Sequence, residues 1–117
     1  MLKKEYRLKK RTAFTATYRT GKSFHKDGIT VFCGKIKKED FPTKFGFVVS
    51  KKIHKRAVKR NRIKRLMRES LRLIIKNKPD FDTKYMSLVF VASTHLLNKN
   101  FSDIDKRIKK IMSVINA

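Results

Sequence analysis

The stretch KFGFVVSKKIHKRAVKRNRIKRLMRESLRLIIKN, residues 44–77, holds the two features that decide the fold. Its first part, FGFVVSK (45–51), is rich in β-branched and aromatic residues, which is typical of a strand. From Ala57 to Lys76, apolar residues recur every three or four positions, which predicts an amphipathic helix. We therefore expect a strand followed by a long helix at the centre of the fold.

The polar side of this helix is almost entirely basic. Apolar or small residues stand at positions 63, 66, 67, 70, 71 and 74, with Ser70 as the polar member of the stripe. Basic residues at successive i+4 steps form a ridge of Arg60, Lys64, Arg68 and Arg72. Like charges at this spacing destabilise an isolated helix by about 0.2–0.5 kcal/mol per pair. We therefore expect the ridge to meet a polyanion. Asn77 and Pro79 are expected to end the helix.

Two further elements are predicted before this stretch. RTAFTATYRTG (11–21) indicates a short helix with Thr12 as its N-cap and Gly21 as its stop. ITVFCG (29–34) indicates a strand that we expect to run antiparallel to the strand at 45–51. Alternation along this strand puts Ile29, Val31 and Cys33 on one face and Thr30 and Phe32 on the other.

Two more elements are predicted after it. SLVFVA (87–92) is nearly uninterrupted in its apolar character, as expected for a buried central strand. SDIDKRIKKIMSVI (102–115) indicates a helix capped by Ser102, with Asp105 three residues on as in a capping box. No repeat or flexible linker interrupts the chain, so residues 1–117 are expected to form one domain. The predicted class is α+β, a sandwich in which helices cover one face of a three- or four-stranded sheet.

The charge of the whole chain agrees with that of the helix. The 117 residues include 32 Lys and Arg against 9 Asp and Glu, a formal net charge of +23, and no acid occurs between Asp40 and Glu69. Such a charge destabilises the compact chain by self-repulsion, which a bound polyanion relieves. Nucleic acid is therefore the first partner class and an anionic membrane surface the second. Charge alone does not separate DNA from RNA.

The composition also indicates a compartment. Cys33 is the single cysteine, so the chain forms no internal disulfide and suits a reducing environment. The longest apolar run, LVFVA (88–92), has the length of a strand, and the N-terminus lacks an apolar signal region. We expect a soluble cytoplasmic protein with no membrane-spanning segment.

Patterns for catalysis or metal binding are missing from the sequence. His25, His54 and His95 have no carboxylate or cysteine at motif spacing. Asp80 and Asp82 are interpreted as loop acids, and no glycine-rich phosphate-binding motif is present. The residues themselves therefore predict a binding protein with no catalytic residue and no metal site.

Three aromatic residues are candidates for contact with bases. Phe32 remains on the open side of the sheet if helices cover the face of Ile29. Phe14 and Tyr18 share a helix face at i,i+4 and could line the same cleft. Stacking contributes about 1–3 kcal/mol per base and tolerates any base sequence. The alternative is that these rings belong to the core, and for Phe14 the two interpretations are equally favoured.

The run of residues 44–70 closely resembles the protein subunit of bacterial ribonuclease P. Its most specific parts are VVSKK (48–52) and RNRIKRLMRE (60–69). RLKKRTAFTATYRTGKS (7–23) and SLVFVAS (87–93) extend the resemblance over nearly the whole chain, in order and spacing. The family joins two parallel strands through the RNR helix by a left-handed crossover. The resemblance thus implies an exception to the right-handed rule.

The resemblance also implies an activity. Ribonuclease P is a magnesium-dependent endonuclease that removes the 5′ leader from precursor tRNA, and its catalyst is RNA. The implied partners are the catalytic RNA and precursor tRNA, with Mg²⁺ held mainly by RNA and no obligatory protein partner. The helix residues implied to bind the catalytic RNA are Arg60, Asn61, Arg62, Lys64, Arg65 and Arg68. The residues implied to line a cleft for the single-stranded leader are Phe14, Tyr18, Phe32, Ser50, Lys51 and Lys52.

This sequence departs from the family pattern at two of these positions. Tyr18 stands where phenylalanine is common and Phe32 where tyrosine is common, so the stacking faces are kept and the hydroxyl changes place.

Three rival classes share the charge. A structural ribosomal protein would not need an open aromatic cleft. A DNA-binding architectural protein is disfavoured because no helix-turn arrangement precedes the long helix, and an independent nuclease because carboxylate and histidine groupings are missing.

Overall fold

The computed structural model describes residues 2–50, 52, 55–78 and 81–116. These residues form a mixed α+β fold with a four-stranded sheet and three α-helices, so the predicted class is confirmed. Two short 3₁₀ helices, η1 and η2, complete it. The elements in chain order are η1 (Lys4–Tyr6), α1 (Arg11–Arg19), β1 (Lys22–Lys26), β2 (Ile29–Cys33), β3 (Lys44–Val48), α2 (Ala57–Asn77), β4 (Ser87–Ala92), η2 (Thr94–Leu96) and α3 (Phe101–Ile115).

The strand order in the sheet is β1-β2-β4-β3. β4 pairs antiparallel with β2 and parallel with β3, so its predicted central position is confirmed. Phe90 of β4 stands opposite Val31 on one side and Phe47 on the other. β2 and β3 do run in opposite directions, as expected, but β4 separates them. The helix between β3 and β4 is long enough to return the chain to the start of a parallel neighbour.

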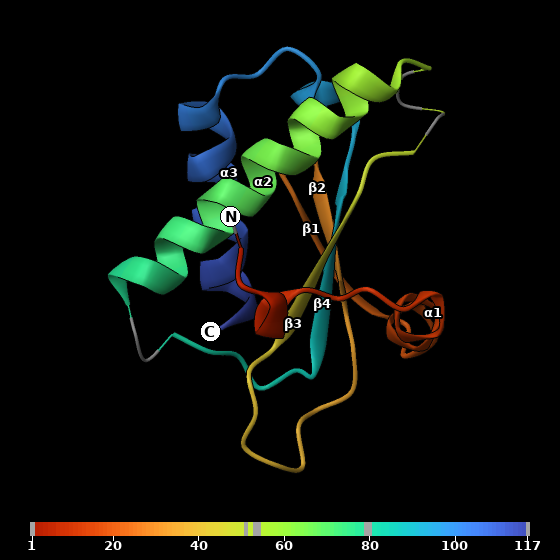
Figure 1. The fold of residues 1–117 in the computed structure, drawn as a ribbon, viewed down its shortest axis with the longest axis vertical. Helices are drawn as coiled ribbons and strands as arrows, with labels where there is room; N and C mark the ends of the chain where they lie inside the picture. Colours follow the sequence, from red (N-terminus) through yellow and green to blue (C-terminus); the bar gives the residue numbers. More distant parts are fainter. Residues whose placement is uncertain (1, 51, 53–54, 79–80, 117) are drawn as a thin grey trace.

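The connection from β3 through α2 to β4 is the crossover that the resemblance implies. In the view of Figure 1 the chain rises along β3, descends through α2 on the left, and rises again along β4 behind β3. That path turns anticlockwise as it recedes, which makes the crossover left-handed. The usual right-handed preference is therefore overridden in this fold.

The strand β1 was not located by the sequence analysis, which allowed for a third or fourth strand without placing it. β1 forms a hairpin with β2, in register from Lys22 opposite Cys33 to Lys26 opposite Ile29. The turn consists of Asp27 and Gly28, whose φ angles of 51° and 84° suit a primed turn. The Asp-Gly pair was an available signal. The polar residues of β1 hide the alternation that marks a strand.

The two faces of the sheet are covered differently. Ile29, Val31 and Cys33 are fully buried on the face that α2 and α3 cover (Figure 1), which confirms the predicted alternation of β2. The predicted cover of one face by helices applies to α2 and α3, whereas α1 packs on the opposite face against β2 and β4. There Thr17 is buried, and its hydroxyl lies 2.6 Å from that of Ser87. The apolar side of α1 needs cover of its own, and the second face supplies it.

The helix boundaries correct both predicted N-caps. α1 begins at Arg11 and its first turn closes on the carbonyl of Lys10, so Thr12 lies inside the helix. α3 begins at Phe101, and the side chain of Asn100 accepts a hydrogen bond from the Asp103 amide at 2.9 Å, which places Ser102 inside the helix. Asparagine is as good an N-cap as serine. The N-cap of α3 is therefore Asn100 and not the predicted Ser102.

The long helix α2 agrees closely with its predicted extent. Ile63, Met67, Ser70 and Leu71 are buried, and the predicted apolar stripe is confirmed. Ser70 fits this stripe because its hydroxyl donates to the carboxylate of Asp105 on α3 at 2.8 Å. A buried hydroxyl without a partner would be costly, and this pair removes that cost.

None of the helices in the described part of the chain is long and apolar enough to cross a membrane.

Candidate nucleic-acid interface

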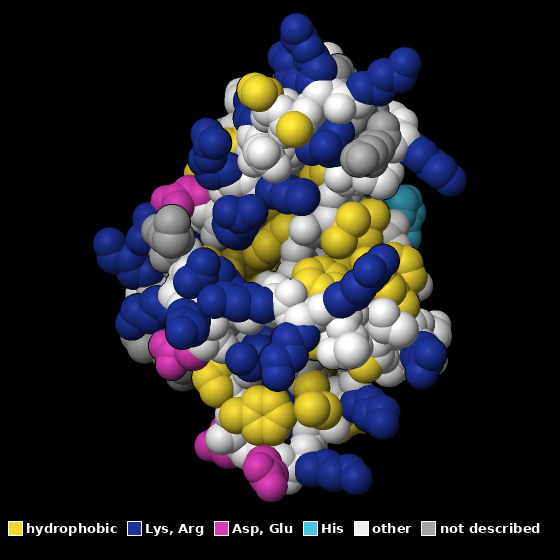
Figure 2. Space-filling view, turned by 45° about the vertical axis from the view of Figure 1, so that its right-hand side comes forward, with side chains coloured by type: hydrophobic (Ala, Val, Ile, Leu, Met, Phe, Trp, Pro, Cys, Tyr) yellow, Lys and Arg dark blue, Asp and Glu magenta, His cyan; other side chains and the backbone are white. Residues whose placement is uncertain are grey.

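Basic side chains gather on the side of the molecule where α1 lies. In Figure 2 this side is turned forward, and Lys and Arg side chains border a hollow in which hydrophobic side chains are visible. The uncovered part of the sheet on this side carries Thr30, Phe32, Val48 and Val91, all half-buried, whereas Val89 beneath α1 is fully buried. α1 therefore covers only part of this face.

Tyr18 and Phe32 form the aromatic edge of this open face. Their ring centroids are 5.0 Å apart and their planes lie at 89°, an edge-to-face contact between α1 and β2. Tyr18 is 39% exposed, and Phe32 is half-buried. Burial raises the pKa of the Tyr18 hydroxyl, so it stays protonated at neutral pH. Both rings keep exposed surface that a base could contact, and neither is a core residue.

Phe14 lies deeper than Tyr18 because it packs on the backbone of β3. A Cβ atom added at Gly46 would be 2.6 Å and 2.7 Å from two atoms of the Phe14 ring. Phe14 is half-buried, so it serves both packing and the surface beside α1. Gly46 is thus required by this close approach rather than by its backbone angles.

The remaining cleft candidates follow β3. Ser50 and Lys52 are exposed beyond the end of the strand, on the way to α2. Lys51 lies outside the described residues. The stretch after β3 thus places a hydroxyl and an ammonium group in solvent.

The structure divides the predicted RNA-binding residues of α2 by direction. Asn61 and Arg65 are exposed on its outer side. Arg62 is half-buried and donates to the carbonyl of Lys99 at 3.0 Å, so it also holds the segment before α3. Arg60 donates to the carbonyl of Lys55 at 2.7 Å. The sequence motif did not show that these two arginines have structural partners.

The predicted basic ridge ends earlier than expected. Arg72 donates through Nε and Nη2 to both carboxylate oxygens of Glu69, at 3.0 Å and 2.6 Å. The hydrogen bonds from Arg72 lower the pKa of the Glu69 carboxyl. This forked pair neutralises Arg72, so Arg68 is the last member of the ridge without a carboxylate among the described residues.

Lys64 and Arg68 face the edge of the sheet and the N-terminal segment. They line a cavity of about 270 Å³ together with Phe14, Gly46 and neighbours that include Arg7 and Lys9. The basic side of α2 and the aromatic side of α1 therefore adjoin at this cavity. Arg7 and Lys9 were missed by the sequence analysis. The basic run at the N-terminus was a signal, but nothing in its spacing indicated where it would dock.

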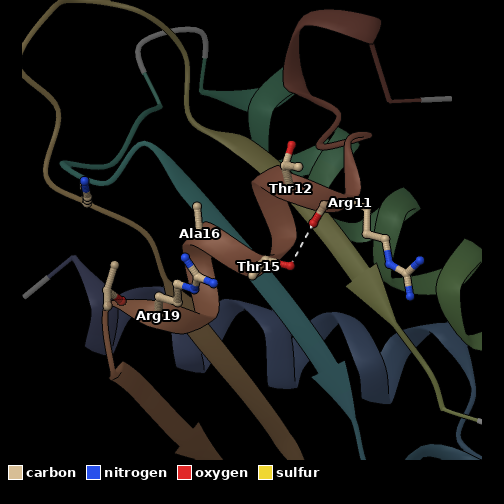
Figure 3. Close-up of a pocket in the computed structure, with 7 residues that line it drawn as sticks. Arg11, Thr12, Thr15, Ala16 and Arg19 are labelled. Atoms are coloured by element: carbon tan, nitrogen blue, oxygen red, sulfur yellow. Dashed lines mark hydrogen bonds between the residues drawn. The ribbon is translucent and has the colours of Figure 1, made fainter.

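A second basic groove lies along the outer side of α1, shown in Figure 3. Its volume is about 540 Å³, and its lining residues are Arg11, Thr12, Thr15, Ala16, Arg19, Thr20 and Lys35. The Thr15 hydroxyl donates to the carbonyl of Arg11 at 3.1 Å. No aromatic residue lines this groove, and it is separate from the surface that carries Tyr18 and Phe32.

In the part of the chain that the structure describes, the acidic, histidine and cysteine side chains show no metal-binding arrangement. No three of them come together in a possible metal site within the described residues. His25 is hydrogen-bonded to the Thr30 hydroxyl at 2.7 Å. Cys33 is buried in the sheet, where burial raises the pKa of its thiol, as expected for an inert core cysteine.

The fold is thus a small mixed sheet with half-exposed aromatic rings beside a basic helix, an α+β architecture. The family model described as Ribonuclease P matches residues 2–116, and the chain belongs to this family. It is 39% identical over 107 residues to the ribonuclease P protein component of Clostridioides difficile, covering 90% of this chain and 87% of the relative. It is 38% identical to that of an Exiguobacterium species, covering 93% and 91%.

Solved structures show the same fold. The Staphylococcus aureus RNase P protein superposes with a TM-score of 0.78 at 26% identity, covering 97% of this chain and all of that one. The Thermotoga maritima RNase P protein gives a TM-score of 0.76 at 23% identity, covering 95% and 98%. The left-handed connection and the four-stranded sheet therefore belong to a known architecture.

Proposed function

We propose that this chain is the protein subunit of a ribonuclease P in which RNA is the catalyst, and that it binds both that RNA and the 5′ leader of precursor tRNA. The observation that carries the proposal is the position of Tyr18 and Phe32. Tyr18 is exposed on α1 and Phe32 is half-buried on the sheet, so both rings keep accessible surface beside a partly uncovered sheet face that cations border. Aromatic rings beside a basic surface suit single-stranded RNA of any sequence.

The RNR side of α2 is proposed to hold the catalytic RNA. Asn61 and Arg65 are its exposed members, with Arg60, Arg62, Lys64 and Arg68 around them. Guanidinium groups present forked donors to phosphate oxygens, and a phosphate-rich surface also relieves the repulsion within a chain of net charge +23.

The leader is proposed to run over the aromatic surface of α1 and the open sheet face. Phe14, Tyr18 and Phe32 would supply stacking, and Ser50, Lys51 and Lys52 polar contacts. The protein then raises substrate affinity without supplying a catalytic residue. Mg²⁺ is proposed to be held mainly by RNA, in a cytoplasmic ribonucleoprotein.

Reconstitution with a ribonuclease P RNA tests the proposal. The purified chain should stimulate removal of the 5′ leader from precursor tRNA and lower the Mg²⁺ concentration needed for half-maximal cleavage, because cations shield phosphate repulsion where two RNAs meet. An unchanged Mg²⁺ requirement together with unchanged substrate affinity would reject it. Sequencing the RNA that co-purifies with the chain separates this role from that of a ribosomal protein, which would bring down mainly rRNA.

A further inference from the structure

The cavity between the N-terminal segment, β3 and α2 is built differently from the rest of the basic surface. The N-terminal segment lies along the outer edge of β3, where the Leu8 amide donates to the carbonyl of Phe45 at 2.9 Å and Arg7 forms a parallel bridge to Phe45 (Figure 1). This contact fixes the backbone of Arg7 beside the sheet. It gives the cavity a rigid wall on the side opposite α2.

Four cations from two separate parts of the chain line this cavity, and no acidic residue does. They are Arg7, Lys9, Lys64 and Arg68. Among the described residues, no carboxylate within ion-pair distance is found for any of the four. By contrast, Arg72 lies one helical turn further along α2 and is neutralised by Glu69. The cavity therefore combines uncompensated positive charge with an apolar lining that includes Leu8, Phe45 and Phe47.

Arg7 carries a more specific sign of a missing ligand. Its Nε is buried and has no hydrogen-bond acceptor within the described part of the chain. Buried donors in native proteins are nearly always paired, so an unpaired one needs an explanation. Desolvation and the nearby charges of Arg7, Lys4 and Lys44 lower the pKa of Lys9. An anion held by the Arg7 guanidinium in the cavity would compensate its charge and relieve this crowding.

We infer that this cavity binds one backbone phosphate of single-stranded leader RNA, held by Arg7 and Lys9 together with Lys64 and Arg68. The inference rests on the proposed function and adds two residues of the N-terminal segment to the interface. Phe14 forms part of the same cavity wall, so the phosphate would belong to the nucleotide next to the one stacked on the aromatic surface. The site thereby joins the cleft to the RNR helix.

The isolated protein provides the first test, with inorganic phosphate as the probe at constant ionic strength. Phosphate should raise the unfolding temperature of the wild type, and NMR should place its largest amide shifts at Leu8 and Gly46. Arg7→Gln should weaken phosphate binding about tenfold, because a forked, charge-assisted contact is lost. Arg7→Lys should fall between the two, since it keeps the charge without the fork.

Arg19→Gln is the matched control, because it removes one positive charge from the outer groove of α1. It should leave phosphate affinity within about twofold of the wild type. Equal weakening by Arg7→Gln and Arg19→Gln, or amide shifts away from Leu8 and Gly46, would overturn the inference. If Arg7→Gln does not fold, the wild-type amide shifts and the Arg7→Lys titration decide.

The reconstituted enzyme provides the second test and separates this inference from the proposed function. Arg7→Lys should weaken binding of precursor tRNA with a leader and leave binding of mature tRNA unchanged. Equal weakening with both RNAs would assign Arg7 to the catalytic RNA and reject the leader phosphate. If the wild-type enzyme itself does not distinguish the two RNAs, the proposed function fails rather than this site.

Discussion

The rings of Tyr18 and Phe32 meet edge to face with their centroids 5.0 Å apart, although one residue belongs to a helix and the other to the second strand. This contact fixes the distance between α1 and the sheet at the edge of the open face. It leaves 39% of Tyr18 exposed. The two rings are therefore held in position before RNA binds, so little further side-chain conformational entropy is lost when a base stacks on them.

Removing the Tyr18 ring should weaken leader binding. Tyr18→Ala is expected to reduce the affinity for precursor tRNA with a leader by about 1–3 kcal/mol, the contribution of one stacked base. Tyr18→Phe should keep nearly full affinity, because the hydroxyl has no hydrogen-bond partner in the described part of the chain. Equilibrium binding to the reconstituted enzyme, with and without the leader, measures both. Equal losses for the two substitutions would contradict a stacking role.

Arg65 and Arg62 should respond differently to truncation. Arg65→Ala is expected to weaken binding of the catalytic RNA without changing thermal stability. The slope of the logarithm of the binding constant against the logarithm of the salt concentration should fall in magnitude by about 0.7–0.9, which corresponds to one phosphate contact. Arg62→Ala should also lower the free energy of unfolding by about 1 kcal/mol, because the Lys99 carbonyl loses its donor. Filter binding and urea unfolding make the comparison. Loss of stability in Arg65→Ala would contradict its assignment as an exposed contact.

Gly46→Ala should disturb the aromatic surface from within the sheet. The new methyl group would lie 2.6 Å from the Phe14 ring, so the ring must move, at an expected cost of about 1–3 kcal/mol in unfolding free energy. Adding Phe14→Leu should recover part of that stability but not leader affinity. Urea unfolding and leader binding of the single and double variants test this. No recovery in the double variant would show that the clash lies elsewhere.

Asp82 should make stability depend on pH in the acid range. Desolvation opposes ionisation of this carboxyl, but hydrogen bonds from Lys37 at 2.6 Å, from the Thr83 amide at 2.8 Å and from Thr43 hold its pKa below the usual value. A lowered folded-state pKa stabilises above the unfolded value of about 3.9, and this stabilisation is lost as pH falls through the folded value.

Asp82→Asn should therefore cost about 1 kcal/mol at pH 7, a figure reduced for the 40% exposure of the side chain, and the cost should shrink as pH falls toward about 2. Asp40→Asn, which changes an exposed loop acid, is the control and should have no effect at either pH. Urea unfolding between pH 2 and pH 7 gives both curves. A constant difference between Asp82→Asn and the wild type across this range would show that charge is not the cause.

Local patterns in the sequence determined the elements with strong periodicity. The extent of α2, the burial of Ile63 and Met67, and the central position of β4 followed from spacing and apolar character, because a helix or a fully buried strand imposes its period on the residues. The position of Phe32 on the open face was also predicted, since Phe32 alternates with Ile29 and Val31. β1 was not predicted, because its polar residues hide the alternation of a strand. The caps were not either, because Lys10 makes no side-chain cap on α1 and Asn100 competes with Ser102 on α3.

The tertiary structure alone decided how these elements meet. No spacing in the sequence places Arg7 beside Lys64, since α1 and three strands lie between them along the chain. They come together only when the N-terminal segment pairs with the edge of β3. The pairing of Arg72 with Glu69, by contrast, is an i,i+3 contact within α2 that the spacing in the sequence allows. Periodicity is a property of neighbours along the chain, whereas a phosphate site depends on groups that are close in space. The left-handed connection through α2 brings these groups together.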